Sequence, residues 1–245
     1  MIAPPDAKTG RSAELVVALD VSTVEEAFVA TRALAGLPLW LKVGLELFTS
    51  AGPDCVRDLV EGGHKVFLDL KFHDIPNTVH HAVTNAVLSG AGMLTLHASG
   101  GRAMMEAAVK GKEAAHARLV VANPKAPMPV LLGVTLLTSA GVDEVAGGDV
   151  TACVVSRALL AKESGLDGVV CSGHEAAAVK RACGPSFLCL CPGIRFAGGS
   201  VDDQARVMSP EQAVQAGADF FVMGRPVMRA ENPRKAAEKA LNLIQ

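Results

Sequence analysis

The chain alternates strand-like and helix-like segments eight times, and this alternation constrains its fold more than any other feature. Each strand-like segment is a short apolar run, and a helical stretch follows it before the next run begins. The predicted strands are 15–19, 39–45, 65–70, 93–96, 130–136, 168–171, 187–190 and 220–223. The predicted helices are 24–34, 53–62, 77–89, 102–116, 152–164, 175–182, 211–216 and 233–243. Eight such units in about 240 residues predict an α/β, single-domain (β/α)8 TIM barrel, because a doubly wound sheet more often has five or six strands.

The sequence contains no linker or low-complexity segment that would divide it into two domains. We expect the barrel to span residues 12–245 and treat residues 1–11 as an N-terminal extension. Glycine-containing stretches such as 61–64 are typical of helix ends that lead into the next strand. Segments 140–149 and 197–210 are predicted loops that follow strands, at the end of a barrel where active-site loops lie.

Composition and charge argue against several classes of protein. Half of the 245 residues are apolar, which argues against disorder. Lysine and arginine number 23 against 25 acidic residues, and aromatic residues are few, so we expect no nucleic-acid binding. No apolar run approaches the roughly 18 residues that span a bilayer, and the first residues lack the apolar core of a signal peptide. A soluble, cytoplasmic protein without membrane attachment is therefore expected.

The cysteines and histidines do not predict a metal site. The six cysteines lie mostly in apolar segments without a C-x-x-C pair, so we expect reduced residues of the core. Cys189 and Cys191 have the spacing of a metal pair, but they lie in a predicted strand and no second pair of ligands accompanies them. No H-x-x-x-H pair occurs, and His80 and His81 are expected to face outward or into packing.

Three charged residues, Asp69, Lys71 and Asp74, lie within six positions directly behind the third apolar run. Side chains at positions i and i+2 of a strand share a face, so Asp69 and Lys71 should project together while Leu70 points away. Asp74 lies beyond the strand and before the next helix. Carboxylates beside a lysine favour its protonated form, and the ammonium group can then stabilise a carbanion and protonate it. The spacing therefore favours a proton-donating site.

Polar residues recur at or just after the carboxyl ends of the predicted strands, which form the catalytic face of a barrel. They are Asp20, Lys42, Asp69, Lys71, His97, Thr138, Ser139, Arg195 and Arg225. A charged lysine inside the apolar run 39–45 is costly unless carboxylates meet it, and Asp20 and Asp69 are its expected neighbours. Asp20 has the alternative interpretation of a helix cap, because caps are the commonest role of such a residue.

The pair Gly224-Arg225 directly follows the eighth predicted strand. Barrels bind phosphate at this place, with the loops after strands seven and eight and with nearby backbone N–H groups. We therefore predict phosphate binding at Arg225. The alternative is that Arg225, which precedes Pro226, is an ordinary surface residue.

With these residues in place, the chain resembles the orotidine 5′-phosphate decarboxylase family over nearly its whole length. Residues 69–78 resemble the D-x-K-x-x-D signature of that family and the I-P-x-T that follows it. The supporting segments, in the same order as in the family, are 19–20, 42–44, 137–139, 192–195, 202–204 and 224–226.

The resemblance implies decarboxylation of orotidine 5′-monophosphate to UMP and CO2, the last step of de novo pyrimidine synthesis, without a cofactor or metal. Lys71 would be the proton donor within a charge network formed with Lys42, Asp69 and Asp74. Lys42 and Asp69 would belong to this charge network and would also bind the substrate. The full set of implied substrate ligands is Asp20, Lys42, Asp69, Ile75, Thr78, Thr138, Arg195, Gln204, Gly224 and Arg225. The resemblance also implies a homodimer in which Asp74, Ile75 and Thr78 enter the neighbouring subunit's site, and a lid at 197–208 that carries Gln204.

Two other functions compete with this prediction. A Mg²⁺-dependent sugar-phosphate decarboxylase or aldolase of the same barrel superfamily would share the D-x-K-x-x-D pattern and the phosphate site. The continuation at 72–76, together with Gln204 and the segment 192–195, favours orotidylate instead. A non-catalytic phosphate-binding barrel would keep Gly224 and Arg225 but would not need the cluster of charges around Lys71.

Overall fold

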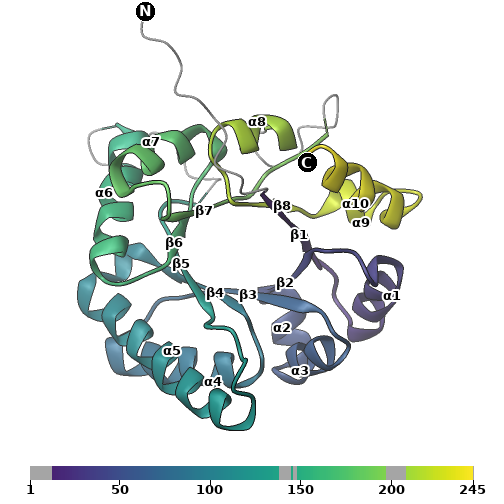
Figure 1. Ribbon diagram of the computed structural model, residues 1–245, viewed down its shortest axis with the longest axis horizontal. Helices are drawn as coiled ribbons and strands as arrows, with labels where there is room; N and C mark the ends of the chain where they lie inside the picture. Colours follow the sequence, from purple (N-terminus) through teal and green to yellow (C-terminus); the bar gives the residue numbers. More distant parts are fainter. Residues whose placement is uncertain (1–12, 138–144, 146–147, 197–207, 245) are drawn as a thin grey trace, which may run out of the picture.

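The computed structural model describes residues 13–137, 145, 148–196 and 208–244. Its eight parallel strands close into a barrel in which each strand pairs with its neighbours in chain order and β8 pairs with β1. Helices form a ring around the strands (Figure 1). The strands are β1 Glu14–Ala18, β2 Trp40–Gly44, β3 Lys65–Phe72, β4 Met93–His97, β5 Val130–Val134, β6 Gly168–Val170, β7 Leu188–Cys191 and β8 Phe220–Met223. The predicted (β/α)8 TIM barrel is confirmed.

All eight predicted helices are present, with ends that differ from the prediction by a few residues. They are α1 Val24–Leu34, α3 Asp54–Glu61, α4 Pro76–Leu88, α5 Arg102–Ala122, α6 Val150–Glu163, α7 Gly173–Cys183, α8 Pro210–Gln215 and α10 Pro233–Asn242. The largest difference is at α5, which continues to Ala122 rather than ending at His116. Nothing between these two residues stops a helix, since the stretch contains neither glycine nor proline.

Three short helical elements were not predicted: α2 Leu45–Ala51, the 3-10 helix η1 Ala98–Gly100 and α9 Arg225–Met228. The prediction that the second strand extends to Leu45 was wrong, because the chain turns at Gly44 and α2 begins at Leu45. Pro210, predicted as the end of a loop, is the first residue of α8, where proline is tolerated because the first helical N–H has no partner within the helix.

Several predictions fall on residues that the structure does not describe. They include the N-terminal extension at 1–11, most of the loops at 140–149 and 197–210, and the candidate residues Thr138, Ser139 and Gln204. The boundary between an extension and the barrel therefore stays a prediction.

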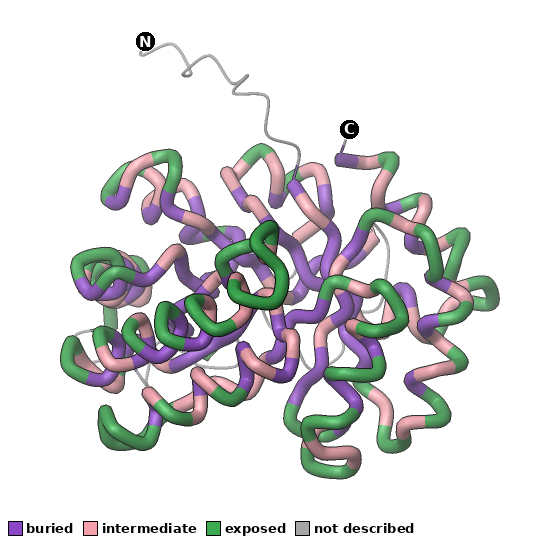
Figure 2. Tube along the Cα trace, turned by 60° about the horizontal axis from the view of Figure 1, so that its bottom comes forward, coloured by how far each residue is buried: buried purple, intermediate pink, exposed green. Residues whose placement is uncertain are grey.

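Two layers of apolar side chains stabilise the barrel. On β1, Val16 and Ala18 belong to the cluster inside the barrel, whereas Leu15 and Val17 belong to the larger cluster between strands and helices. The alternation follows from the period of two along a strand. Burial is accordingly concentrated on the strands and on the inner sides of the helices (Figure 2).

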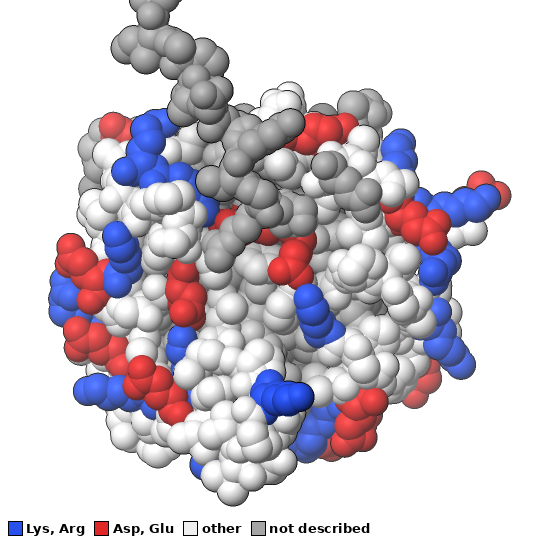
Figure 3. All heavy atoms as spheres, viewed as in Figure 1, with Lys and Arg blue, Asp and Glu red and all other residues white. Residues whose placement is uncertain are grey.

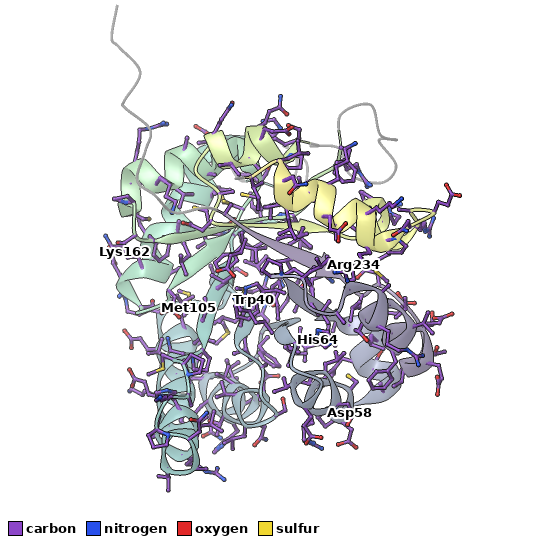
Figure 4. The ribbon with its side chains drawn as sticks, turned by 45° about the vertical axis from the view of Figure 1, so that its right-hand side comes forward. Trp40, Asp58, His64, Met105, Lys162 and Arg234 are labelled. Carbon is purple, nitrogen blue, oxygen red and sulfur yellow. The ribbon has the colours of Figure 1, made fainter. Side chains whose placement is uncertain are left out.

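Trp40 closes the interior near the amino ends of the strands. It lies near the centre of the molecule, whereas Asp58 and Lys162 lie on outer helices (Figure 4). Its indole Nε1–H donates to Glu14 Oε2 at 3.0 Å, and Lys65 Nζ donates to the same oxygen at 3.0 Å. The ring also packs edge-on against Phe220, with 6.3 Å between centroids. At this end of the barrel the Trp40 ring is therefore packed, and Trp40 and Lys65 share Glu14 as their hydrogen-bond acceptor.

All six cysteines are free thiols, and five of them are buried. A hydrogen bond with Cys171 and burial raise the pKa of the Cys189 thiol. Both effects disfavour the thiolate, which is the reactive form. The prediction that the cysteines lie mostly in the core is confirmed.

Helices α4 and α5 pack closely against each other at Gly111, where a side chain would overlap the His80 carbonyl oxygen. Thr84 Oγ1 donates to that same carbonyl at 2.8 Å.

We expect Gly111→Ala to lower the free energy of unfolding by about 1–3 kcal/mol, because overpacking outweighs the roughly 1 kcal/mol by which alanine favours a helix. Denaturant unfolding measures the change. Lys110→Ala, at the exposed neighbouring position, is the control, and equal stability of both variants with the parent protein would contradict the prediction.

Candidate active site

A cavity of about 250 Å³ opens at the carboxyl ends of the strands. Its inner part is apolar and is lined by Phe67, Val134, Val170 and Leu190, which belong to the cluster inside the barrel. Its charged lining residues are Asp20, Lys42, Asp69, Lys71, Arg195 and Arg225. The structure thus brings together, in one cavity, six charged residues that the sequence placed at the ends of five different strands.

Four of these side chains form a chain of alternating charge. Lys42 Nζ lies 3.0 Å from Asp20 Oδ1 and 3.8 Å from Asp69 Oδ2. Lys71 Nζ lies 2.9 Å from the same Asp69 oxygen. The side chains of Lys42 and Asp69 are only 13% and 14% exposed, so water screens their interaction weakly. The predicted neighbours of Lys42 are confirmed.

The structure decides between the two interpretations of Asp20. Thr23 is the residue that caps α1, with its side chain accepting from the Glu26 N–H. Asp20 instead forms an ion pair with Lys42 and lines the cavity. Gly44 and Gly224 leave room for this pair, because a Cβ at either position would lie 3.0 Å from Lys42 Nζ or 3.1 Å from Asp20 Oδ2.

Asp69 and Lys71 meet as predicted, but β3 is not regular where they lie. The pairing of β3 with β4 shifts between Leu68 and Phe72. Lys71 has φ of +52°, and among the described residues it alone has a positive φ without being glycine. A non-glycine residue in this region is uncommon, and such strain concentrates at functional sites. The i, i+2 rule of a regular strand is therefore not sufficient to explain the contact.

Sequence reasoning missed Thr95 of β4, which contacts both residues. Its hydroxyl donates to Asp69 Oδ1 at 2.9 Å and accepts from the Lys71 backbone N–H at 3.0 Å. Thr95 is fully buried. The sequence did contain a signal for this contact, because Thr95 is a polar residue in the middle of the apolar run 93–96 and its buried hydroxyl needs a hydrogen-bond partner.

Arg195 and Arg225 line the part of the cavity that follows β7 and β8. Arg195 is 7% exposed, and its Nε has no hydrogen-bond partner among the residues described. A buried guanidinium with an unused donor beside a cavity suits an anionic ligand. Arg225 is half-buried and lines the cavity, which argues against the alternative of an ordinary surface residue.

Asp74, Ile75 and Thr78 do not line this cavity. Asp74 is exposed and its Oδ1 accepts from the Ile75 N–H at 2.7 Å. Asp74 and Thr78 line a second cavity, of about 420 Å³, that reaches Lys71 from another side. Ile75 is 67% exposed at the start of α4. The intact D-x-K-x-x-D motif is thus divided in space: Asp69 pairs with Lys71 within the chain, whereas Asp74 forms no ion pair in the described part of it.

His97 lies near Lys71 on the wall of the second cavity. Its ring is 5.2 Å from that of His73, measured between centroids. Burial, followed by the positive charges that His73, Lys71 and Arg157 can carry, lowers the pKa of His97. The lowered pKa of His97 disfavours a further positive charge beside Lys71.

No group of three or more His, Cys, Asp or Glu side chains is arranged to hold a metal ion within the described ranges. In the same part of the chain, no helix is both long and apolar enough to cross a membrane. Acidic and basic side chains are interspersed around the face seen in Figure 3, rather than gathered in one patch of either sign.

Comparison with known proteins adds an independent observation. The chain is 50% identical over 247 residues to the orotidine 5′-phosphate decarboxylase of Nitratidesulfovibrio vulgaris (strain DSM 19637 / Miyazaki F), covering 95% of this chain and 97% of that protein. It is 46% identical to the enzyme of the same name from Bacillus caldolyticus, with 89% of each chain covered. The crystal structure of orotidine 5′-phosphate decarboxylase from Lactobacillus acidophilus superposes with a TM-score of 0.83 at 34% identity, covering 95% of this chain and 99% of that one. The profile of the orotidine 5′-phosphate decarboxylase / HUMPS family matches residues 13–240, and the chain therefore belongs to this family.

Proposed function

We propose that this protein decarboxylates orotidine 5′-monophosphate to UMP and CO2, the last step of de novo pyrimidine synthesis. The observation that carries the proposal is the alternating chain Asp20, Lys42, Asp69 and Lys71 at the rim of a cavity that also holds two arginines. The relatives named decarboxylases favour this reaction over that of a Mg²⁺-dependent sugar-phosphate enzyme.

The phosphate of the substrate is assigned to Arg195, Gly224 and Arg225. The unused Nε–H of buried Arg195 supports this assignment, as does the position of Arg225 directly after β8. The ribose hydroxyls are assigned to Asp20 and Lys42, because Asp20 lies beside Gly224 and Lys42 lies within 4 Å of both Asp20 and Asp69. Thr138, for the pyrimidine edge, and Gln204, for the phosphate, complete the proposed set on the strength of the sequence resemblance.

Lys71 is the proposed proton donor. The bond between C6 and the carboxylate breaks, CO2 leaves, and the electron pair stays on C6 until the Lys71 ammonium transfers a proton to form the C6–H bond of UMP. A unit charge pair about 4 Å apart is worth roughly 4 kcal/mol at an effective dielectric constant near 20. The ammonium thus stabilises the developing carbanion before it delivers the proton. Asp69 Oδ2 accepts a hydrogen bond of 2.9 Å from this ammonium group, and both residues line the cavity.

The proposed reaction needs no metal or cofactor. Both carboxylates of the four-residue charge network are already paired with an ammonium group. Asp20 is paired with Lys42, and Asp69 is paired with Lys71. The Mg²⁺-dependent relatives share the D-x-K-x-x-D pattern, so the Asp69–Lys71 pair alone does not separate the two classes of enzyme. Dependence of turnover on a divalent cation does.

The absorbance change on loss of the orotidylate carboxylate tests the proposal. Purified, folded protein is assayed with orotidine 5′-monophosphate in the presence and absence of EDTA. Equal turnover in both supports the metal-free decarboxylase. Turnover that EDTA abolishes supports the Mg²⁺-dependent class instead, and the absence of any absorbance change refutes the assignment.

We further propose a cytoplasmic homodimer in which Asp74, Ile75 and Thr78 complete the site of the neighbouring subunit. The exposure of Ile75 and the absence of an ion pair at Asp74 in the described chain support this arrangement. We assign the approach of the neighbouring subunit to the second cavity, because Lys71 lines it together with Asp74 and Thr78.

Subunit mixing tests whether Asp74 acts across the dimer. Asp74→Ala and Lys71→Ala are each expected to inactivate the protein, but unfolding and refolding them together should restore roughly a quarter of the parent activity. Half of the dimers are then mixed, and one of the two sites in each carries neither substitution. Activity is measured by absorbance, with separately refolded single variants as controls. No recovery in mixtures that contain the mixed dimer would contradict the proposal.

A further inference from the structure

Thr95 occupies a special position opposite the irregular part of β3. Leu68 pairs with Leu94 and Phe72 pairs with Leu96, so residues 69–71 of β3 face a single residue of β4, which is Thr95. This mismatch is a local irregularity of the β3–β4 pairing, and such irregularities redirect side chains and are frequent next to active sites. The residues redirected here include Asp69 and Lys71, the ion pair from which the proton is proposed to come.

The Thr95 hydroxyl contacts both of these residues at once. A hydroxyl group offers one donor and two acceptor positions. Thr95 uses the donor toward Asp69 Oδ1, at 2.9 Å, and accepts from the Lys71 backbone N–H, at 3.0 Å. The side chain is 0% exposed, so water does not replace either bond.

The two hydrogen bonds have separate effects, one on the Asp69 carboxylate and one on the Lys71 backbone. The bond to Asp69 occupies Oδ1 and leaves Oδ2 to meet Lys71 Nζ at 2.9 Å and Lys42 Nζ at 3.8 Å. The bond from the Lys71 N–H holds the backbone at φ of +52°, a conformation that a lysine does not favour by itself. The direction in which the ammonium group points therefore depends on this hydroxyl.

We propose that Thr95 is a positioning residue for the decarboxylation, acting through Asp69 and Lys71 rather than on the substrate. The inference rests on the proposed function and extends it to a residue outside the D-x-K-x-x-D motif. Thr95 does not line the cavity, so its contribution is to the orientation of the proton donor and not to ligand affinity.

Thr95→Val removes the hydroxyl while keeping the shape of the side chain. Loss of hydrogen bonds to a charged group and to the Lys71 backbone is expected to lower kcat by about 10- to 100-fold. The KM for orotidine 5′-monophosphate and the Kd for UMP should change by less than about threefold, because the phosphate contacts are untouched. Thr95→Ser, which keeps the hydroxyl, should recover most of kcat.

Thr135→Val is the matched control. Thr135 is 1% exposed, follows β5, and donates its hydroxyl to the Val170 carbonyl at 2.8 Å, so this variant also loses a buried hydrogen bond. Its kcat should stay near that of the parent protein. Unfolding curves establish that each variant is folded, and Thr95→Ala removes the same hydroxyl if Thr95→Val does not fold.

The outcomes separate this inference from the proposed function. A parent protein without decarboxylase activity refutes the function itself. An active parent protein with a folded Thr95→Val variant whose kcat is within about threefold of it overturns the inference. A loss in Thr135→Val as large as that in Thr95→Val also overturns it, whereas a loss confined to Thr95→Val and rescued by Thr95→Ser establishes it.

Discussion

Lys71→Ala is expected to lower decarboxylation by at least about 10⁴-fold, the largest effect of any single substitution in this protein. The variant loses the electrostatic stabilisation of the carbanion, worth about 10²- to 10³-fold for one donor, and the proton transfer itself, worth about 10²- to 10⁴-fold. UMP binding should persist, because the arginines of the phosphate site lie after other strands. Absorbance assays at high protein concentration and calorimetric titration with UMP measure the two quantities.

Lys65→Ala is the control for this prediction. Lys65 begins the same strand, lies at the opposite end of the barrel and pairs with Glu14 at 3.0 Å. Its side chain is 56% exposed, so its removal should change activity by less than about threefold and stability by at most about 1 kcal/mol. A folded Lys71→Ala variant with near-normal turnover would rule out the proposed mechanism.

Arg225→Ala is expected to lower kcat/KM by about 10²- to 10³-fold, with a clear rise in KM. Charge-assisted hydrogen bonds to phosphate are strong, and the energy they supply far from C6 can be used in the transition state as well as in binding. Steady-state kinetics with orotidine 5′-monophosphate resolve the two contributions.

The nucleoside orotidine, which lacks the phosphate, provides the sharpest control for Arg225. The parent protein and Arg225→Ala should turn it over at equally low rates, because the lost interaction is absent from both reactions. Arg229→Ala, an exposed arginine at the end of α9, should leave both substrates unaffected. An equal loss of activity on orotidine and on its phosphate would show that Arg225 does not act through the phosphate.

The fold was predictable because its determinants are local. Each strand of the barrel is a short apolar run, and each is followed by a helical stretch, so the eight units were evident from hydrophobic pattern alone. The exceptions are short elements. Helix α9 spans only Arg225–Met228, and α2 begins directly at the end of β2, so neither has the length that a periodic pattern requires.

The candidate site was predictable to the extent that strand ends of a barrel share one face. That rule was enough to group Asp20, Lys42, Asp69 and Lys71 before any distance was known. It could not rank their contacts: Lys42 lies closer to Asp20 than to Asp69. Distances of this kind depend on the register between β1, β2 and β3, which is set by the closure of the whole barrel.

The order of the eight units is visible in the amino-acid sequence, as are the charged residues at the carboxyl ends of the strands and the spacing of Asp69, Lys71 and Asp74. How that motif is divided and supported depends on contacts that form only in the folded barrel. The pairing of β3 with β4 is irregular where Lys71 has a positive φ, and Thr95 of β4 hydrogen-bonds to both Lys71 and Asp69. These features arise between two strands that are about 25 residues apart in the chain, and a hydrogen bond between strands leaves no periodic signal in either one.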